Sequence, residues 1–91
     1  MLIKDGVTLA GLKLVMSSVL PLIEKVYNYH NLVMVVTSTT EEVPGRIREA
    51  HLDGRAVDLR AHQVNPYLIP VIVRTIRNAI GSDYAVSPVV T

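Results

Sequence analysis

The segment Glu49-Ala50-His51-Leu52-Asp53-Gly54-Arg55-Ala56-Val57-Asp58 places an imidazole and a carboxylate seven positions apart. In one straight strand His51 and Asp58 would lie about 23 Å apart on opposite faces, and in one helix they would lie about 10 Å apart. Neither spacing lets two ligands approach one ion at about 2 Å. Asp53-Gly54 is a turn sequence, because glycine adopts the positive φ angles that reverse a chain. We therefore expect a turn that brings His51 and Asp58 together, with Ala56 leaving space beside the carboxylate.

Two strands are expected on either side of a polar loop. Residues 55–60 alternate apolar and polar side chains, as a strand does. Residues 32–37, Leu-Val-Met-Val-Val-Thr, are short, rich in β-branched side chains and apolar on both faces, which favours a central strand. Residues 38–50 have no period and many turn formers, which indicates a loop.

The rest of the chain predicts two main helices and a third strand. Apolar residues recur at steps of three and four over residues 12–29, and Pro21 within them should kink or restart that helix. Asn65-Pro66 begins a helix of about fifteen residues that Gly81 closes. Residues 83–86 could begin a third strand, and Pro88 limits it or marks it as an edge strand. This order indicates one α+β domain over residues 1–91, with a small, largely antiparallel sheet packed against two main helices.

Composition excludes several classes of function. The formal net charge of +1 gives no attraction to nucleic acid, and the absence of cysteine leaves His and carboxylate as the only ligands for a metal site. Asp5 and Gly6 interrupt any secretory signal, and no apolar run is long enough to span a membrane. We expect no nucleic-acid or membrane partner. The mean hydropathy of +0.35 suggests that a partner or a second copy covers some apolar surface.

The pattern His51-x-x-Gly54-x-Ala56-x-Asp58 resembles the metal motif of the D-alanyl-D-alanine metallopeptidases. This family contains VanX/VanY-type dipeptidases and carboxypeptidases, phage endolysins and, by fold, the hedgehog signalling domain. The similarity extends over nearly the whole chain, through segments in matching order: Asp5-Gly6-Val7-x-Leu9, Leu20-Pro21-x-Ile23-Glu24, Val36-Thr37-Ser38 and Asp83-Tyr84-x-Val86. Small phage-encoded members are the most similar.

The resemblance implies a hedgehog-like or DD-peptidase-like fold and a Zn²⁺ site. His51 and Asp58 would be two of its three ligands, and Gly54 and Ala56 would be structural. Family members continue into a His-x-His segment that supplies the third ligand, with a nearby carboxylate as general base. This sequence stops at Thr91, so the resemblance implies a domain that is incomplete at its C-terminus.

Two further positions depart from the family pattern. Glu49 stands where the family usually has Ser, which would put an extra carboxylate near the ion. The family's Ser-Gly-x-Arg turn has no Arg here, and Arg46 or Arg48, together with Ser38, would take over substrate binding.

Simpler interpretations of these residues stay open. Asp58 could form an ion pair with a nearby arginine instead of binding metal, because burying an unpaired carboxylate is costly. His62 is interpreted as a surface residue, although it is the only other histidine near the motif that could serve as a ligand. His30 follows the first expected helix and is interpreted as structural.

Two hypotheses about function follow. The first is a phage-type zinc metallopeptidase that hydrolyses peptidoglycan stem peptides, as a D-Ala-D-Ala carboxypeptidase or an endolysin. It would be made in the host cytoplasm and act at the bacterial cell wall. The second is a catalytically inactive descendant that serves as a structural or interaction protein, as a homo-oligomer or with a partner in a bacteriophage virion.

Overall fold

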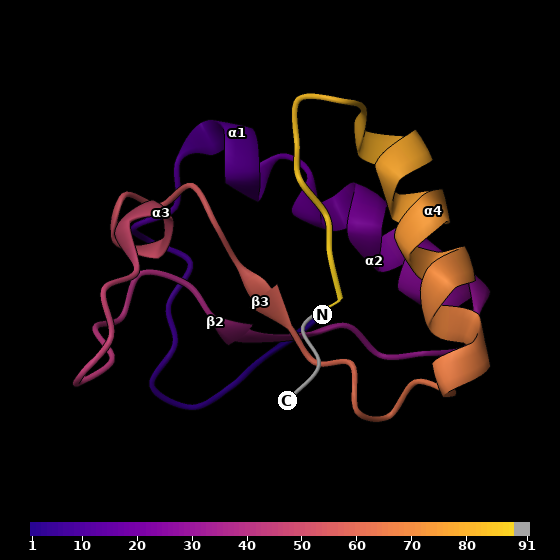
Figure 1. Ribbon diagram of the computed structural model, residues 1–91, viewed down its shortest axis with the longest axis horizontal. Coiled ribbons are helices and arrows are strands. Elements are labelled where there is room, and N and C mark those ends of the chain that lie inside the picture. Colours follow the sequence, from indigo (N-terminus) through magenta and orange to yellow (C-terminus); the bar gives the residue numbers. More distant parts are fainter. Residues whose placement is uncertain (89–91) are drawn as a thin grey trace.

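The computed structural model describes residues 1–88 and has an α+β architecture around a three-stranded mixed sheet (Figure 1). The sheet order is β1 (Leu2–Ile3), β2 (Val35–Ser38) and β3 (Asp58–Leu59). The central position of β2 confirms the prediction from its apolar sequence. β1 pairs with β2 in parallel and β3 pairs with β2 antiparallel. The sheet is therefore mixed, and "largely antiparallel" describes only one of its two strand pairs.

The first expected helix is divided into α1 (Leu14–Ser17) and α2 (Leu20–Tyr29). Pro21 lies in the first turn of α2, where its missing N–H costs no helical hydrogen bond. The helix therefore restarts at the proline rather than bending around it. The second helix begins as predicted, with a 3-10 turn η1 (Pro66–Leu68) that continues into α4 (Ile69–Ile80). Asn65 caps it by accepting a hydrogen bond from the N–H of Tyr67 at 3.0 Å, and Gly81 at φ 89° ends it.

The prediction of a third strand over residues 83–86 is wrong. This segment is irregular, and polar groups in it form hydrogen bonds with other elements. The Tyr84 hydroxyl donates to the carbonyl of Val15 at 2.7 Å, and the Arg77 guanidinium donates to the carbonyl of Val86 at 2.5 Å. Side-chain contacts with α1 and α4 therefore fix the segment without strand pairing. The strand that sequence reasoning missed is β1, which is only two residues long.

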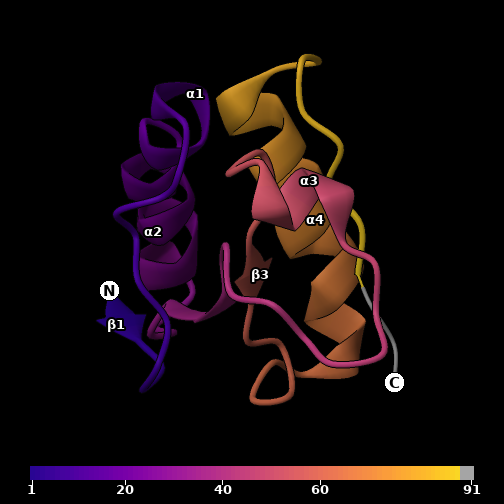
Figure 2. The ribbon, with the colours of Figure 1, turned by 90° about the vertical axis from the view of Figure 1, so that its left-hand side faces the viewer.

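The hydrophobic core lies where α2 and α4 pack against each other and against the sheet (Figure 2). It is aliphatic apart from one tyrosine, and its buried members are Val19, Leu20, Ile23, Val26, Tyr27, Met34, Val36, Val64, Ile72 and Ile76. α3 (Glu49–Leu52) and the loop that precedes it lie at the end of the molecule away from α4 (Figure 1). Within residues 1–88 no helix has the length and apolar character that crossing a membrane requires.

Candidate functional site

His51 and Asp58 are brought together by a turn at Gly54. His51 lies in the last turn of α3, Gly54 follows that helix at φ 74°, and the chain returns to Asp58, the first residue of β3. The Gly54 carbonyl accepts a hydrogen bond from the N–H of Lys13 at 2.9 Å, which fixes the turn to the segment before α1. Nε2 of His51 then lies 3.5 Å from Oδ1 of Asp58. The turn expected at Gly54 is confirmed.

The tautomer of His51 follows from its second contact. Nδ1 lies 2.8 Å from the carbonyl oxygen of Thr39, and a carbonyl can only accept, so Nδ1 carries the proton. In the neutral ring Nε2 therefore presents its lone pair to the Asp58 carboxylate. Two acceptors face each other, and either a proton on Nε2 or a cation between them would satisfy both. Metal-binding histidines are commonly oriented in this way by a carbonyl on the other ring nitrogen.

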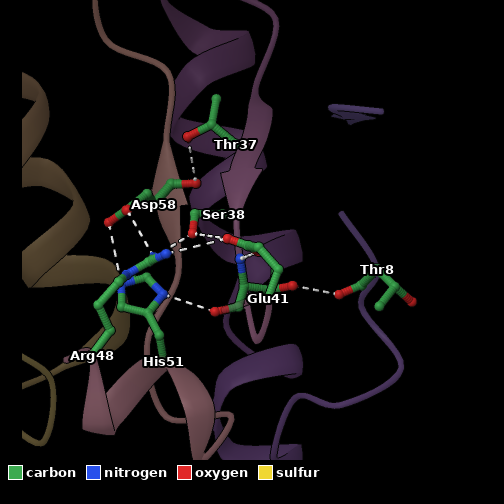
Figure 3. Close-up of polar contacts among 8 residues, drawn as sticks. Thr8, Thr37, Ser38, Glu41, Arg48, His51 and Asp58 are labelled. Carbon is green, nitrogen blue, oxygen red and sulfur yellow. Dashed lines mark hydrogen bonds and ion pairs between the residues drawn. The ribbon is translucent and has the colours of Figure 1, made fainter. Parts of the chain in front are cut away.

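Arg48, the residue before α3, faces the other oxygen of the same carboxylate (Figure 3). Its guanidinium lies 3.5 Å from Oδ2 of Asp58 and 3.3 Å from Oε2 of Glu41, and it donates a hydrogen bond to the Ser38 hydroxyl. The Arg48 side chain is only 15% exposed, whereas that of Asp58 is 49% exposed. One cation is thus shared between two carboxylates, and Asp58 is the one open to solvent.

Glu41 is the acceptor on which several of these contacts converge. Oε1 accepts the N–H of Thr39 at 2.7 Å, and Oε2 accepts from the Ser38 hydroxyl and from Arg48. Desolvation by burial raises the pKa of this carboxyl. The hydrogen bonds from Ser38, from the N–H groups of Thr39 and Glu41, and from Arg48 outweigh that effect and lower the pKa to about 2.

We expect Glu41 to make the free energy of unfolding decrease at low pH. Because its pKa falls from 4.5 to about 2 on folding, its stabilisation is present above pH 4.5 and is lost as the pH falls toward 2. At pH 7, Glu41→Gln should lower the free energy of unfolding by about 1–2 kcal/mol, as for loss of a hydrogen-bonded charge. Urea unfolding at pH 7, 4 and 2.5 measures this, with the exposed neighbour variant Glu42→Gln as control. A wild-type advantage that does not shrink with acid would contradict the assignment.

The other candidate residues occupy distinct positions. Ser38 and Arg48 belong to the cluster, by which we mean the joined polar residues Ser38, Thr39, Glu41, Arg48, His51 and Asp58. Arg46 is exposed and lines a surface hollow of about 640 Å³ beside the cluster. The hollow is lined by residues 41–46, Arg48 and Leu52. Glu49 begins α3 and is exposed, and no hydrogen bond or ion pair within residues 1–88 joins its side chain to His51 or Asp58.

The remaining positions of interest are not part of the cluster. Ala56 is half-buried in the connection between Gly54 and β3, because the observed strand covers only Asp58–Leu59 of the strand expected over residues 55–60. His62 is exposed, in agreement with its interpretation as a surface residue. His30 ends α2, where its ring makes an edge contact with that of Tyr29.

Sequence reasoning missed Glu41 and Thr39, which were treated as ordinary residues of a polar loop. A local signal was present, because Ser38-x-x-Glu41 is the spacing in which a carboxylate reaches back to hydroxyl and N–H groups at the start of a turn. Thr39 is fully buried, which its sequence context does not reveal. The short helix α3 was also missed and replaces the last part of the expected loop.

The pair His51 and Asp58 fits two positions of a zinc site. Tetrahedral zinc with ligand bonds of about 2.0–2.1 Å separates its ligand atoms by roughly 3.3 Å, close to the observed 3.5 Å. The nitrogen is in the required tautomer, and the carboxylate is accessible. Within residues 1–88, no group of three or more His, Asp and Glu side chains is arranged to hold a metal ion. The described part of the chain therefore offers two ligands.

Comparison with known proteins adds no assignment. No protein-family model, curated protein or solved structure matches the chain.

Proposed function

We propose that this protein is a zinc-binding, peptidase-like domain that acts on the stem peptides of peptidoglycan. The proposal includes the DD-peptidase or hedgehog type of fold and D-Ala-D-Ala carboxypeptidase or endolysin activity. The observation that carries it is the convergence of His51 and Asp58, with the imidazole already in the tautomer that ligation needs. The motif resemblance supplies the substrate class, and the geometry supplies the pair of ligands.

Each residue of the cluster has a part in this proposal. Nε2 of His51 and a carboxylate oxygen of Asp58 would hold Zn²⁺, and the Thr39 carbonyl keeps the imidazole oriented. Bound zinc would polarise the scissile peptide carbonyl and activate water for its hydrolysis. Hydrolysis also needs a third zinc ligand and a general base. We assign neither role to a residue of this cluster.

The surface hollow beside the cluster suits a short peptide with a free carboxylate. The charged residues that line it are two arginines and two glutamates, Arg46, Arg48, Glu41 and Glu42. Arg48 is engaged by Glu41 and Asp58, whereas Arg46 is exposed and makes no ion pair within residues 1–88. Arg46 is therefore the better candidate to bind the terminal carboxylate of a stem peptide, because an arginine binds a carboxylate in bidentate fashion. Ser38, which is buried, would act through Arg48.

Zinc titration followed by a turnover assay tests the proposal. We expect saturable, stoichiometric zinc binding by isothermal titration calorimetry, although two protein ligands should make it weak. Release of D-Ala from a D-Ala-D-Ala peptide in the presence of zinc would establish the peptidase activity. The absence of saturable zinc binding at high zinc concentration would refute the proposal.

Two observations favour a second function, that of a non-catalytic structural or interaction module. The Arg48 guanidinium forms an ion pair with Asp58. This pair balances the charge of the carboxylate without a metal ion. Both outer strands of the described sheet, β1 and β3, also have one open edge, and an open edge can pair with another chain. The partner would be a second copy or a virion protein. This function predicts a stable oligomer or complex in solution.

The variant Arg48→Gln separates the two functions. A cation this close to Asp58 opposes a second cation, so removing its charge should tighten zinc binding by roughly five- to tenfold if the site binds metal. Glutamine can still hydrogen-bond to Ser38 and Glu41. In a purely structural cluster the variant would lower thermal stability and leave zinc binding absent. Calorimetric titration of both proteins gives the answer. Arg46→Gln is the matched control, because it changes an exposed arginine that has no ion pair among residues 1–88.

A further inference from the structure

We propose that Glu41 is the positioning residue of the site, because it fixes His51 in its ligating tautomer through the backbone of Thr39. This inference rests on the proposed function, since it assigns a role toward the same zinc site. Glu41 does not touch either ligand directly. It acts on the short turn after β2, over residues 38–41, which carries the carbonyl that orients His51.

Thr39 is held at each of its other polar groups. Its N–H donates to Oε1 of Glu41 at 2.7 Å, and its hydroxyl donates to the carbonyl of Thr8 at 2.5 Å. The residue has no exposed surface. Its carbonyl remains, and this group accepts the Nδ1 proton of His51. The Glu41 carboxylate thus closes the turn that points the carbonyl at the ring.

The alternative arrangement of His51 shows why this contact matters. Without the Thr39 carbonyl, the nearest acceptor for a neutral imidazole is the Asp58 carboxylate, 3.5 Å from Nε2. The ring would then carry its proton on Nε2 and donate it to Asp58. That tautomer has no lone pair on Nε2, so the two candidate ligands would bind each other instead of an ion.

A second contact of Glu41, with Arg48, keeps Asp58 available as a ligand. Its Oε2 atom accepts from Arg48 at 3.3 Å and also from Ser38, which in turn accepts from Arg48. These bonds hold the guanidinium on the Glu41 side, while its distance to Oδ2 of Asp58 is 3.5 Å. Loss of the Glu41 carboxylate would leave Asp58 as the only carboxylate among residues 1–88 that faces Arg48. Glu41 therefore keeps both candidate ligands available.

The tautomer of His51 can be measured without zinc. Two-bond ¹H–¹⁵N correlation spectra of the apo-protein distinguish a proton on Nδ1 from one on Nε2. We expect the Nδ1–H form in the wild type and a shift toward the Nε2–H form in Glu41→Ala. Glu41→Gln retains an amide oxygen for the Thr39 N–H and should restore the Nδ1–H form. Glu42→Ala, which removes the exposed neighbouring carboxylate, should have no effect.

Zinc titration of the same variants gives the second result. Loss of a residue that orients a metal ligand typically weakens metal binding by about 10–100-fold, so we expect this for Glu41→Ala and a smaller loss for Glu41→Gln. An unchanged Nδ1–H tautomer in folded Glu41→Ala would overturn the positioning role, even if zinc binds the wild type. Absence of zinc binding by the wild type would instead refute the proposed function. The tautomer measurement would still decide whether Glu41 positions His51.

A measurement on the unaltered protein covers the case in which Glu41→Ala does not fold. The Thr39 amide should show a through-hydrogen-bond coupling between its ¹⁵N nucleus and the carboxylate carbon of Glu41, as the 2.7 Å contact requires. Detection of this coupling supports the positioning role of Glu41. If the Thr39 amide couples to no side-chain carboxylate and exchanges rapidly with solvent, the proposal is wrong.

Discussion

His51→Ala and Asp58→Ala should each abolish saturable zinc binding. Each variant leaves a single candidate ligand from the pair, and one side chain alone does not compete with water for zinc. The expected loss is therefore complete within the range of a calorimetric titration. Asp58→Asn is the sharper variant, because it keeps the size of the side chain and removes the charge that a cation requires.

The matched control for these variants is His62→Ala. His62 is exposed and lies four positions beyond Asp58, so it is the other histidine that the sequence places near the motif. We expect His62→Ala to bind zinc as the wild type does. If zinc binding depends on His62 and survives loss of His51, the metal site is not the one proposed. Thermal unfolding of each variant separates loss of a ligand from loss of the fold.

The local chemistry of the sequence was enough to predict how His51 and Asp58 meet. Only a reversal between them lets both reach one point, and Asp53-Gly54 was the sole turn sequence in that interval. The same kind of reasoning located the caps of the second helix at Asn65 and Gly81. These features depend on a few neighbouring residues whose backbone preferences are strong.

Features that depend on distant contacts could not be predicted in this way. β1 is two exposed residues whose pairing with β2 is a long-range event, and no period can be recognised over two positions. Residues 83–86 have strand-like composition, but hydrogen bonds from Tyr84 and Arg77 fix them without strand pairing. The role of Glu41 likewise depends on the approach of Arg48 and Thr39 in three dimensions.

Gly54→Ala should destabilise the protein by about 2–5 kcal/mol, the largest effect on stability that we expect from a single methyl group. Gly54 adopts φ 74°, which costs an L-residue about 1–2 kcal/mol. A Cβ atom there would lie 2.3 Å from the carbonyl oxygen of Gly11 and 3.0 Å from the N of Lys13. Both are backbone atoms that cannot rotate away, so overpacking adds about 1–3 kcal/mol.

Comparison with Gly45→Ala isolates the steric part of the destabilisation by Gly54→Ala. Gly45 has nearly the same φ, 79°, but a Cβ atom there would have no neighbour within 4 Å. We expect Gly45→Ala to lower the free energy of unfolding only by the cost of the positive φ angle, about 1–2 kcal/mol. Since 1 kcal/mol shifts the midpoint of thermal unfolding by about 4–8 °C in a domain of this size, calorimetry resolves the two variants easily.

The same substitution connects the turn to the site. To relieve the clash, the chain between α3 and β3 must move away from the segment before α1 and break the bond between the Gly54 carbonyl and Lys13. His51 lies three residues before this turn and Asp58 four residues after it, so their separation of 3.5 Å should not survive. Folded Gly54→Ala should therefore lose zinc binding, while Gly45→Ala should keep it. Equal stability losses in the two variants would show that close packing against Gly11 does not set the turn.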